Sequence, residues 1–235
     1  MDGLAPHVRW LLAAPIYAAA YALAAYVFWL AARRRAMGTD GIARIAAAGL
    51  IGGLAGANLF QLFATGLPGK TIEGGIVGGW LAVIWMKRRL GITRPTGDLF
   101  ALAIPAGEAL GRIGCFIGGC CYGKAASVAW AIHDHGALRH PTQLYLSAAA
   151  ATCFAVLLVV ERRRILAENG LFYLGGVLFC IDRFVVEFFR QNAPVAFGLT
   201  LAQWACCAGA VIFVWRLAKL IQPYDVRSRI VAACR

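Results

Sequence analysis

Charged residues are scarce in this chain of 235 residues, where they make up only 14% of the sequence. Soluble globular domains of ordinary composition carry about 25% charged residues. Hydrophobic residues, by contrast, make up 61% of the chain. This composition excludes an ordinary soluble protein and favours a polytopic membrane protein.

Other features are also missing. The sequence has no low-complexity tract and no convincing internal repeat, so a transporter built from inverted repeats has little support. Acidic residues are few, with 11 against 23 basic residues and a net charge of +12. Because no nucleic-acid-binding motif accompanies this charge, we expect no nucleic-acid partner. The excess of basic residues is instead typical of membrane orientation and of attraction to anionic lipid headgroups.

Seven apolar segments predict an all-α fold with about seven transmembrane helices, in a single domain covering residues 1–235. The segments cover about 10–32, 42–65, 74–86, 99–117, 143–160, 171–189 and 199–217. The first segment is too long for a cleaved signal peptide, and the basic residues at 33–35 follow it too closely. The longest loop expected on the outer side covers 118–141.

Most of the basic residues fall between alternate segments or after the last one, which places them on one side of the membrane. They are Arg33, Arg34, Arg35, Arg44, Lys87, Arg88, Arg89, Arg94, Arg162, Arg163, Arg164, Arg216, Lys219, Arg227, Arg229 and Arg235. The positive-inside rule makes this side cytoplasmic. We therefore expect the N-terminus outside and the C-terminus in the cytoplasm.

The remaining basic residues fall within the segments or toward the outer face, where the orientation rule does not explain them. They are Arg9, Lys70, Arg112, Lys124, Arg139, Arg183 and Arg190. An ionised group at membrane depth is costly unless it faces a polar cavity and finds a partner, so such residues are functional candidates. A cluster of cations near the outer leaflet suits a phosphate headgroup, for which arginine is favoured.

A plainer interpretation of the buried charges stays open. Glu108 and Arg112 are four residues apart, as are Arg183 and Glu187. Residues at this spacing are neighbours on one helix, so each pair could neutralise itself and serve only the structure. Pairing and function are compatible, however.

Four stretches of sequence, in this order, resemble the bacterial prolipoprotein diacylglyceryl transferase family: residues 73–79, 111–117, 139–145 and 183–191. The resemblance implies a membrane enzyme that moves the diacylglyceryl group of phosphatidylglycerol onto the lipobox cysteine thiol of a preprolipoprotein. It implies no cofactor. Its expected partners are phosphatidylglycerol or a related anionic phospholipid, membrane lipids and preprolipoprotein signal peptides. The expected location is the bacterial inner membrane, with the active site toward the outer leaflet.

The resemblance also implies roles for particular residues. Arg112 and Arg183 match arginines of the family motifs and would bind the headgroup or stabilise charge, and Glu73 occupies the position of the base. The expected substrate-binding residues are Gly74, Gly75, Gly114, Cys115, Arg139, His140, Gln143, Tyr145, Glu187 and Arg190. His140 is more simply interpreted as a hydrogen-bond donor that organises the loop than as a base.

The chain departs from the family pattern at several positions. Glu73 stands where the family carries a histidine, Cys115 replaces an asparagine, Cys120 replaces an acidic residue and Leu146 replaces a glutamate. A carboxylate acts as a base only if desolvation raises its pKa toward the working pH. Two alternatives therefore stay open: a relative that transfers a glycerolipid-derived group to a non-protein acceptor, and a non-catalytic lipid-binding or transport protein.

Three of the eight cysteines, Cys115, Cys120 and Cys121, fall at the outer face. A disulfide, a soft metal site with the histidines at 133 and 135, and a nucleophilic Cys115 are all open interpretations. The spacing Cys-x4-Cys-Cys is not a known zinc pattern, so the sequence predicts no metal site. The other cysteines are most simply small buried hydrophobic residues: Cys153, Cys180, Cys206, Cys207 and Cys234.

Overall fold

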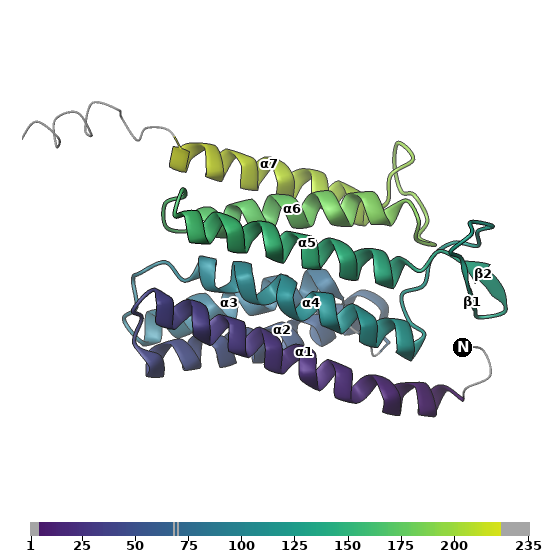
Figure 1. Cartoon of the computed structure of the whole chain (residues 1–235), viewed down its shortest axis with the longest axis horizontal. Helices are drawn as coiled ribbons and strands as arrows, with labels where there is room; N and C mark the ends of the chain where they lie inside the picture. The colour runs from purple at the N-terminus through teal and green to yellow at the C-terminus, as the bar shows by residue number, and fades with distance from the viewer. Residues whose placement is uncertain (1–4, 68, 70, 222–235) are drawn as a thin grey trace, which may run out of the picture. The chain divides into compact units, whose positions relative to one another are not determined.

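The computed structural model describes residues 5–67, 69 and 71–221. The helices in this part are α1 (Pro6–Arg34), α2 (Thr39–Thr65), α3 (Ile72–Arg89), α4 (Gly97–Gly118), α5 (Thr142–Arg163), α6 (Gly170–Glu187) and α7 (Leu201–Ile221). Each coincides with one of the apolar segments of the sequence, and the ends agree to within four residues. The expected loop at 118–141 is the connection between α4 and α5 (Figure 1).

Five helices of the described part are long and apolar enough to cross a membrane: α1, α2, α4, α5 and α7. This confirms an all-α membrane protein. α6 differs because it carries Asp182, Arg183 and Glu187 within its 18 residues, and α3 ends in the basic run Lys87–Arg89. Two of these three α6 charges, Arg183 and Glu187, are ones that the sequence singles out as functional candidates.

The chain falls into two compact units. One consists of the residues up to Val27 and from Thr96 onward, and the other of Phe28–Pro95. In the first unit, α5 packs between α4 and α6, α7 packs on α6, and α4 also contacts α6 (Figure 1). Leu99, Leu102, Leu146 and Leu157 are almost fully buried in this bundle. The prediction of a single domain stays a prediction.

A buried carboxylate links the starts of α4 and α6. Asp98, in the first turn of α4, is 4% exposed and accepts hydrogen bonds of 3.0 Å from the backbone N–H groups of Asn169 and Phe172. The first N–H groups of a helix have no partner within the helix, and a negative charge suits them. This contact fixes α6 against α4, the two helices that carry the predicted arginines.

In the second unit, glycines let α2 and α3 approach closely. A Cβ atom on Gly56 would lie 2.3 Å from the carbonyl oxygen of Gly74, and a Cβ on Gly78 would lie 2.4 Å from that of Gly52. Small residues four apart allow such backbone contact between membrane helices. Gly74, expected to bind substrate, therefore has a packing role.

The connection between α4 and α5 contains a small antiparallel hairpin that the sequence analysis did not predict. Strand β1 (Ile132–Asp134) pairs with β2 (Ala137–Arg139) through a two-residue turn. The turn residues His135 and Gly136 have φ angles of 50° and 73°. Two successive positive φ angles are what a type I′ turn requires, because its twist matches that of the paired strands.

Candidate active site

The first predicted arginine, Arg112, forms an ion pair within α4. Its Nε and Nη2 donate hydrogen bonds of 3.0 and 2.7 Å to one oxygen, Oε1, of Glu108. Both side chains are largely buried, with exposed fractions of 10% and 16%. Because Arg112 has no further hydrogen bond to the described residues, Nη1 keeps its capacity to bind another acceptor.

The second predicted arginine, Arg183, lies beside a fully buried carboxylate of its own helix. Its Nη1 is 2.8 Å from Oε2 of Glu187, and Nε of Arg190 is 3.7 Å from the same oxygen. Neither Nη1 nor Oε2 makes a hydrogen bond with a described residue despite this short distance. One buried carboxylate thus faces two guanidinium groups.

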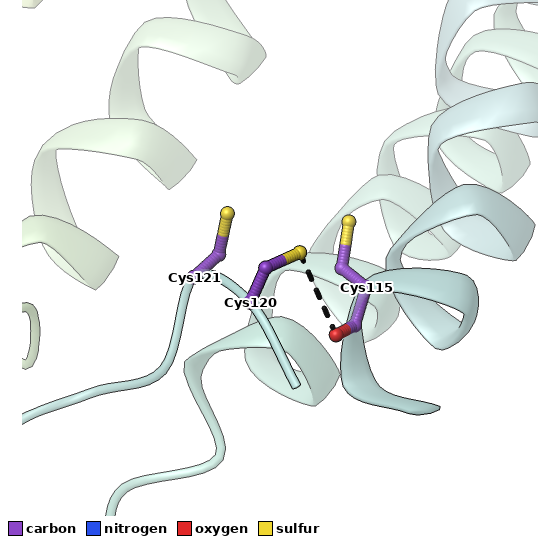
Figure 2. Close-up of side chains that lie close together, drawn as sticks. All are labelled: Cys115, Cys120 and Cys121. Atoms are coloured by element: carbon purple, nitrogen blue, oxygen red, sulfur yellow. Dashed lines mark hydrogen bonds between the residues drawn. The ribbon is translucent and has the colours of Figure 1, made fainter. Parts of the chain in front are cut away.

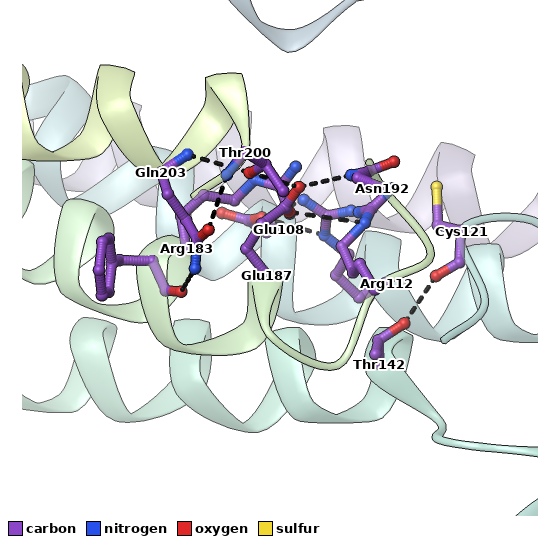
Figure 3. A network of polar contacts seen from close by, with 11 residues as sticks. Glu108, Arg112, Cys121, Thr142, Arg183, Glu187, Asn192, Thr200 and Gln203 are labelled. Atoms are coloured by element: carbon purple, nitrogen blue, oxygen red, sulfur yellow. Dashed lines mark hydrogen bonds and ion pairs between the residues drawn. The ribbon is translucent and has the colours of Figure 1, made fainter. Parts of the chain in front are cut away.

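Further polar residues hold Glu187 in place. Its Oε1 accepts hydrogen bonds from Nδ2 of Asn192 and, at 3.2 Å, from Oγ1 of Thr200. Gln203 accepts from the backbone of Thr200 through Oε1 and donates from Nε2 to the carbonyl of Phe184 (Figure 3). Sequence reasoning missed these partners. They follow α6 or lie on α7, so no helical spacing relates them to Glu187.

The two pairs come together where α4 contacts α6 (Figure 3). Arg183 is close enough to Arg190 and Arg112 for their positive charges to act on it. Asp182, to which the sequence analysis gave no role, interacts electrostatically with Glu108 and is itself largely buried.

We call this group the buried charge cluster: Glu108, Arg112, Asp182, Arg183, Glu187 and Arg190. Oδ1 of Asp182 is buried without a hydrogen-bond partner among the described residues. With all groups ionised, the cluster has three positive and three negative charges. Chemically, the cluster offers guanidinium hydrogen-bond donors, each beside a carboxylate, and donors of this kind can bind a phosphate.

The predicted loop residues organise the hairpin between α4 and α5. Arg139 donates to the carbonyl of Asp134 at 3.1 Å and to Oε1 of Gln191 at 3.1 Å, and its guanidinium lies 4.8 Å above the ring of Tyr122. These contacts tie the hairpin to the residues that follow α6. For Arg139 the structure therefore supports a structural role, which leaves substrate binding as a prediction.

His140 and Tyr145 form a second polar contact at the base of the loop. Nδ1 of His140 is 3.1 Å from Oη of Tyr145, which also accepts a 2.6 Å hydrogen bond from Nε1 of Trp130. Both rings meet Phe189 edge to face. This geometry agrees with His140 as a residue that organises the loop.

The three cysteines lie together at the C-terminal end of α4, with Cys115 in its last turn and Cys120 and Cys121 just after it. Nε2 of Gln143 donates to the carbonyl of Cys120 at 2.7 Å, and Oγ1 of Thr142 donates to that of Cys121 at 2.8 Å. Hydrogen bonds from the other two thiols, aided by the charges of Arg190 and Arg112, lower the pKa of Cys121. Cys121 thus lies within electrostatic range of two members of the buried charge cluster, Arg112 and Arg190.

The other predicted site residues have the following surroundings. A Cβ on Gly114 would lie 3.0 Å from the ring of Tyr17, so this glycine makes room for α1, whereas a Cβ on Gly75 would make only ordinary contacts, the nearest at 3.5 Å. Glu73 lies in the first turn of α3, in the second unit, and its side chain is outside the described part. Its role as a base stays a prediction. A small crevice of about 10 Å³ between the loop and α4 is lined by residues that include Phe116, Tyr122 and Gln143.

A model of the prolipoprotein diacylglyceryl transferase family matches residues 7–219, nearly the whole chain. The chain belongs to the prolipoprotein diacylglyceryl transferase family. Among the curated relatives, it is similar to the phosphatidylglycerol–prolipoprotein diacylglyceryl transferase of Campylobacter curvus, with 36% identity over 143 residues, which cover 59% of this chain and 53% of that protein.

Two further relatives carry the same name. The protein of Idiomarina loihiensis is 35% identical over 158 residues, 63% of this chain and 58% of that protein. The protein of Pseudomonas entomophila is 34% identical over 177 residues, 68% of this chain and 65% of that protein. The aligned part of the chain thus spans between about half and two thirds of the length of these family members.

Proposed function

We propose that this protein transfers the diacylglyceryl group of phosphatidylglycerol to the cysteine thiol of a prolipoprotein. Membership of the family and the names of the curated relatives support this activity. The structural observation that links this activity to particular residues is the buried charge cluster. Three guanidinium groups would be expensive in an apolar helical bundle unless they served a ligand or a partner.

In the proposed reaction, the thiolate sulfur attacks the glyceryl carbon that carries the phosphate ester. The new C–S bond forms as the C–O bond breaks, and the oxygen leaves with the bonding electrons as glycerol phosphate. The thiol proton goes to a base, the position that the resemblance gives to Glu73. Arg112 and Arg183 would hold the phosphate and stabilise the charge on the leaving group, since guanidinium groups bind phosphate oxygens in pairs.

The free donor of Arg112 supports this role. Both of its hydrogen bonds go to a single oxygen of Glu108, which leaves Nη1 for a phosphate oxygen. Arg183 shares the carboxylate of Glu187 with Arg190, so it is not fully neutralised by one partner. We propose Gln143, Tyr145, Arg190 and the neighbouring loop as the walls of the substrate site.

We further propose that all seven helices span the bacterial inner membrane, with the N-terminus outside and the C-terminus in the cytoplasm. The basic ends of α1, α3 and α5 support this orientation through the positive-inside rule. The hairpin loop between α4 and α5 then lies on the outer side, and the buried charge cluster faces the outer leaflet.

The test is transfer from labelled phosphatidylglycerol to a lipobox peptide by the full chain in proteoliposomes. Arg112→Ala should lower the rate by about 10²–10³-fold, the usual effect of removing one group that stabilises developing charge. Arg163→Ala, at the exposed end of α5, is the matched control and should keep the wild-type rate. Arg112→Lys, which keeps a positive charge beside Glu108, guards against a simple folding defect.

Transfer by Arg112→Ala within a few-fold of the control would contradict the assigned role. If the label entered only new lipids and never the peptide, the acceptor would be wrong. If the wild-type protein bound phosphatidylglycerol without turnover, the activity itself would be wrong.

A further inference from the structure

Three thiols converge on one point at the outer end of α4. The Sγ atoms of Cys115, Cys120 and Cys121 all lie within 4.8 Å of one another, and each residue is half-buried (Figure 2). In Figure 2 the sulfur of Cys120 lies between the other two. The transferase chemistry proposed above uses none of these thiols.

The local backbone explains why the first two thiols meet. Gly119 ends α4 with a φ of 70°, and its N–H bonds to the carbonyl of Phe116, while the N–H of Cys120 bonds to that of Cys115 at 3.1 Å. This is a Schellman motif, in which the residue after the glycine folds back onto the residue five positions earlier. The spacing Cys-x3-Gly-Cys therefore places Cys120 against Cys115.

The third thiol is brought in by a second left-handed residue. Cys121 has a φ of 60°, a conformation that a residue with a side chain adopts only at some cost. The hydrogen bond from Thr142 to its carbonyl holds this turn, as the hydrogen bond from Gln143 holds Cys120. Residues at the start of α5 thus fix the arrangement of the thiols.

The spacing of the sulfur atoms fits a metal ion. Zinc binds thiolates at about 2.3 Å, so neighbouring sulfurs of a tetrahedral site are about 3.8 Å apart. The limit of 4.8 Å observed here requires only small rotations of the side chains. Thiolates select soft or borderline cations such as zinc over calcium and magnesium.

We propose that Cys115, Cys120 and Cys121 bind one zinc ion as three thiolates and leave its fourth position to water or another exogenous ligand. Three protein ligands with one open position are typical of zinc sites that exchange a ligand. One zinc ion with three thiolates carries one net negative charge.

A hydrogen-bond acceptor for a zinc-bound water is also present near the site. Oε1 of Gln143 is buried and has no hydrogen-bond partner among the described residues, while its Nε2 is fixed on Cys120. Metal sites use such outer groups to orient the ligands they hold. The proposal does not depend on the transferase activity.

The experiment measures the metal content of the full chain purified in detergent without chelator, by elemental mass spectrometry. We expect about one zinc per chain. The triple variant Cys115→Ser, Cys120→Ser and Cys121→Ser should fall to the background. Cys153→Ser, on α5 and outside the thiol group, is the matched control and should keep its zinc.

Cobalt exchanged into the wild-type protein should give a sulfur-to-metal charge-transfer band that the triple variant lacks. Helicity by circular dichroism should be equal in all samples. A misfolded triple variant would be uninformative, so the single variant Cys120→Ser is measured as well. Its serine keeps the backbone contacts of the Schellman motif. This variant should lose at least about tenfold in zinc affinity.

Three results would overturn the proposal: zinc in the wild-type protein no higher than in the triple variant, copper bound in place of zinc, or a disulfide among the three cysteines in the intact mass. Since zinc is measured directly, these results are distinct from a failure of transferase activity.

Discussion

Glu187 is the residue whose removal should disturb the protein most. Its side chain is fully buried, and its carboxylate pairs with Arg183 while also facing Arg190. Replacing it with glutamine keeps the shape but leaves two guanidinium groups without their carboxylate. Breaking a buried ion pair by removing one partner typically destabilises by about 3–5 kcal/mol. At roughly 2–4 °C per kcal/mol for a chain of this size, the midpoint of thermal unfolding should fall by about 10 °C.

The assay is thermal unfolding of the purified protein in detergent, followed by circular dichroism. Glu168→Gln is the matched control, because Glu168 is an exposed carboxylate and surface pairs contribute about 0–1 kcal/mol. If the two variants unfolded at the same temperature, Glu187 would not carry the charge balance of the bundle, and the reasoning would fail.

A double variant separates the structural role from the functional one. Replacing a whole buried ion pair with apolar residues is often neutral for stability. Arg183→Met with Glu187→Met should therefore recover much of the stability that Glu187→Gln loses, and Arg190, at the edge of the cluster, should turn toward solvent. The double variant should nevertheless have no transferase activity. A double variant that is both stable and active would show that Arg183 serves only to neutralise Glu187.

Two further predictions concern glycines. Gly56→Ala should separate α2 from α3 and lower the midpoint of thermal unfolding, because the new Cβ would lie 2.3 Å from the carbonyl oxygen of Gly74. The control is Gly53→Ala on the same helix. Its Cβ would meet its nearest atom at 3.4 Å, so this substitution should be tolerated. Equal midpoints would contradict the close packing. Gly123→Ala should expose the loop between α4 and α5 to added protease, because its Cβ would lie 2.6 Å from the carbonyl oxygen of His140. An unchanged cleavage rate would refute that contact.

The positions of the helices could be predicted because long apolar segments bounded by basic residues leave few alternatives. Each helix lies within four residues of its predicted segment. The hairpin at 132–139 was missed because its strands are only three residues long, too short for an alternating pattern. The signal that was available is the turn itself, where Gly136 follows His135.

The site could be predicted in part. Motif positions identified Arg112 and Arg183, and the structure brings both into one buried charge cluster. The spacing of the cysteines matches no known zinc pattern, but it does carry a signal for their contact in space. A glycine between Cys115 and Cys120, at the end of an apolar segment, indicates a Schellman motif and hence a contact between the two cysteines.

Spacing alone does not separate a structural ion pair from a functional one, because any carboxylate four residues from an arginine can reach it on a helix. The partners contributed from outside the helix are more informative. Glu187 receives hydrogen bonds from Asn192 and Thr200, and Gln203 fixes Thr200 in turn. A pair that only neutralised itself would need none of these and would be replaceable by apolar residues without loss. The chain instead devotes three polar side chains to fixing one carboxylate, which argues that the position of its arginine partners is what the arrangement preserves.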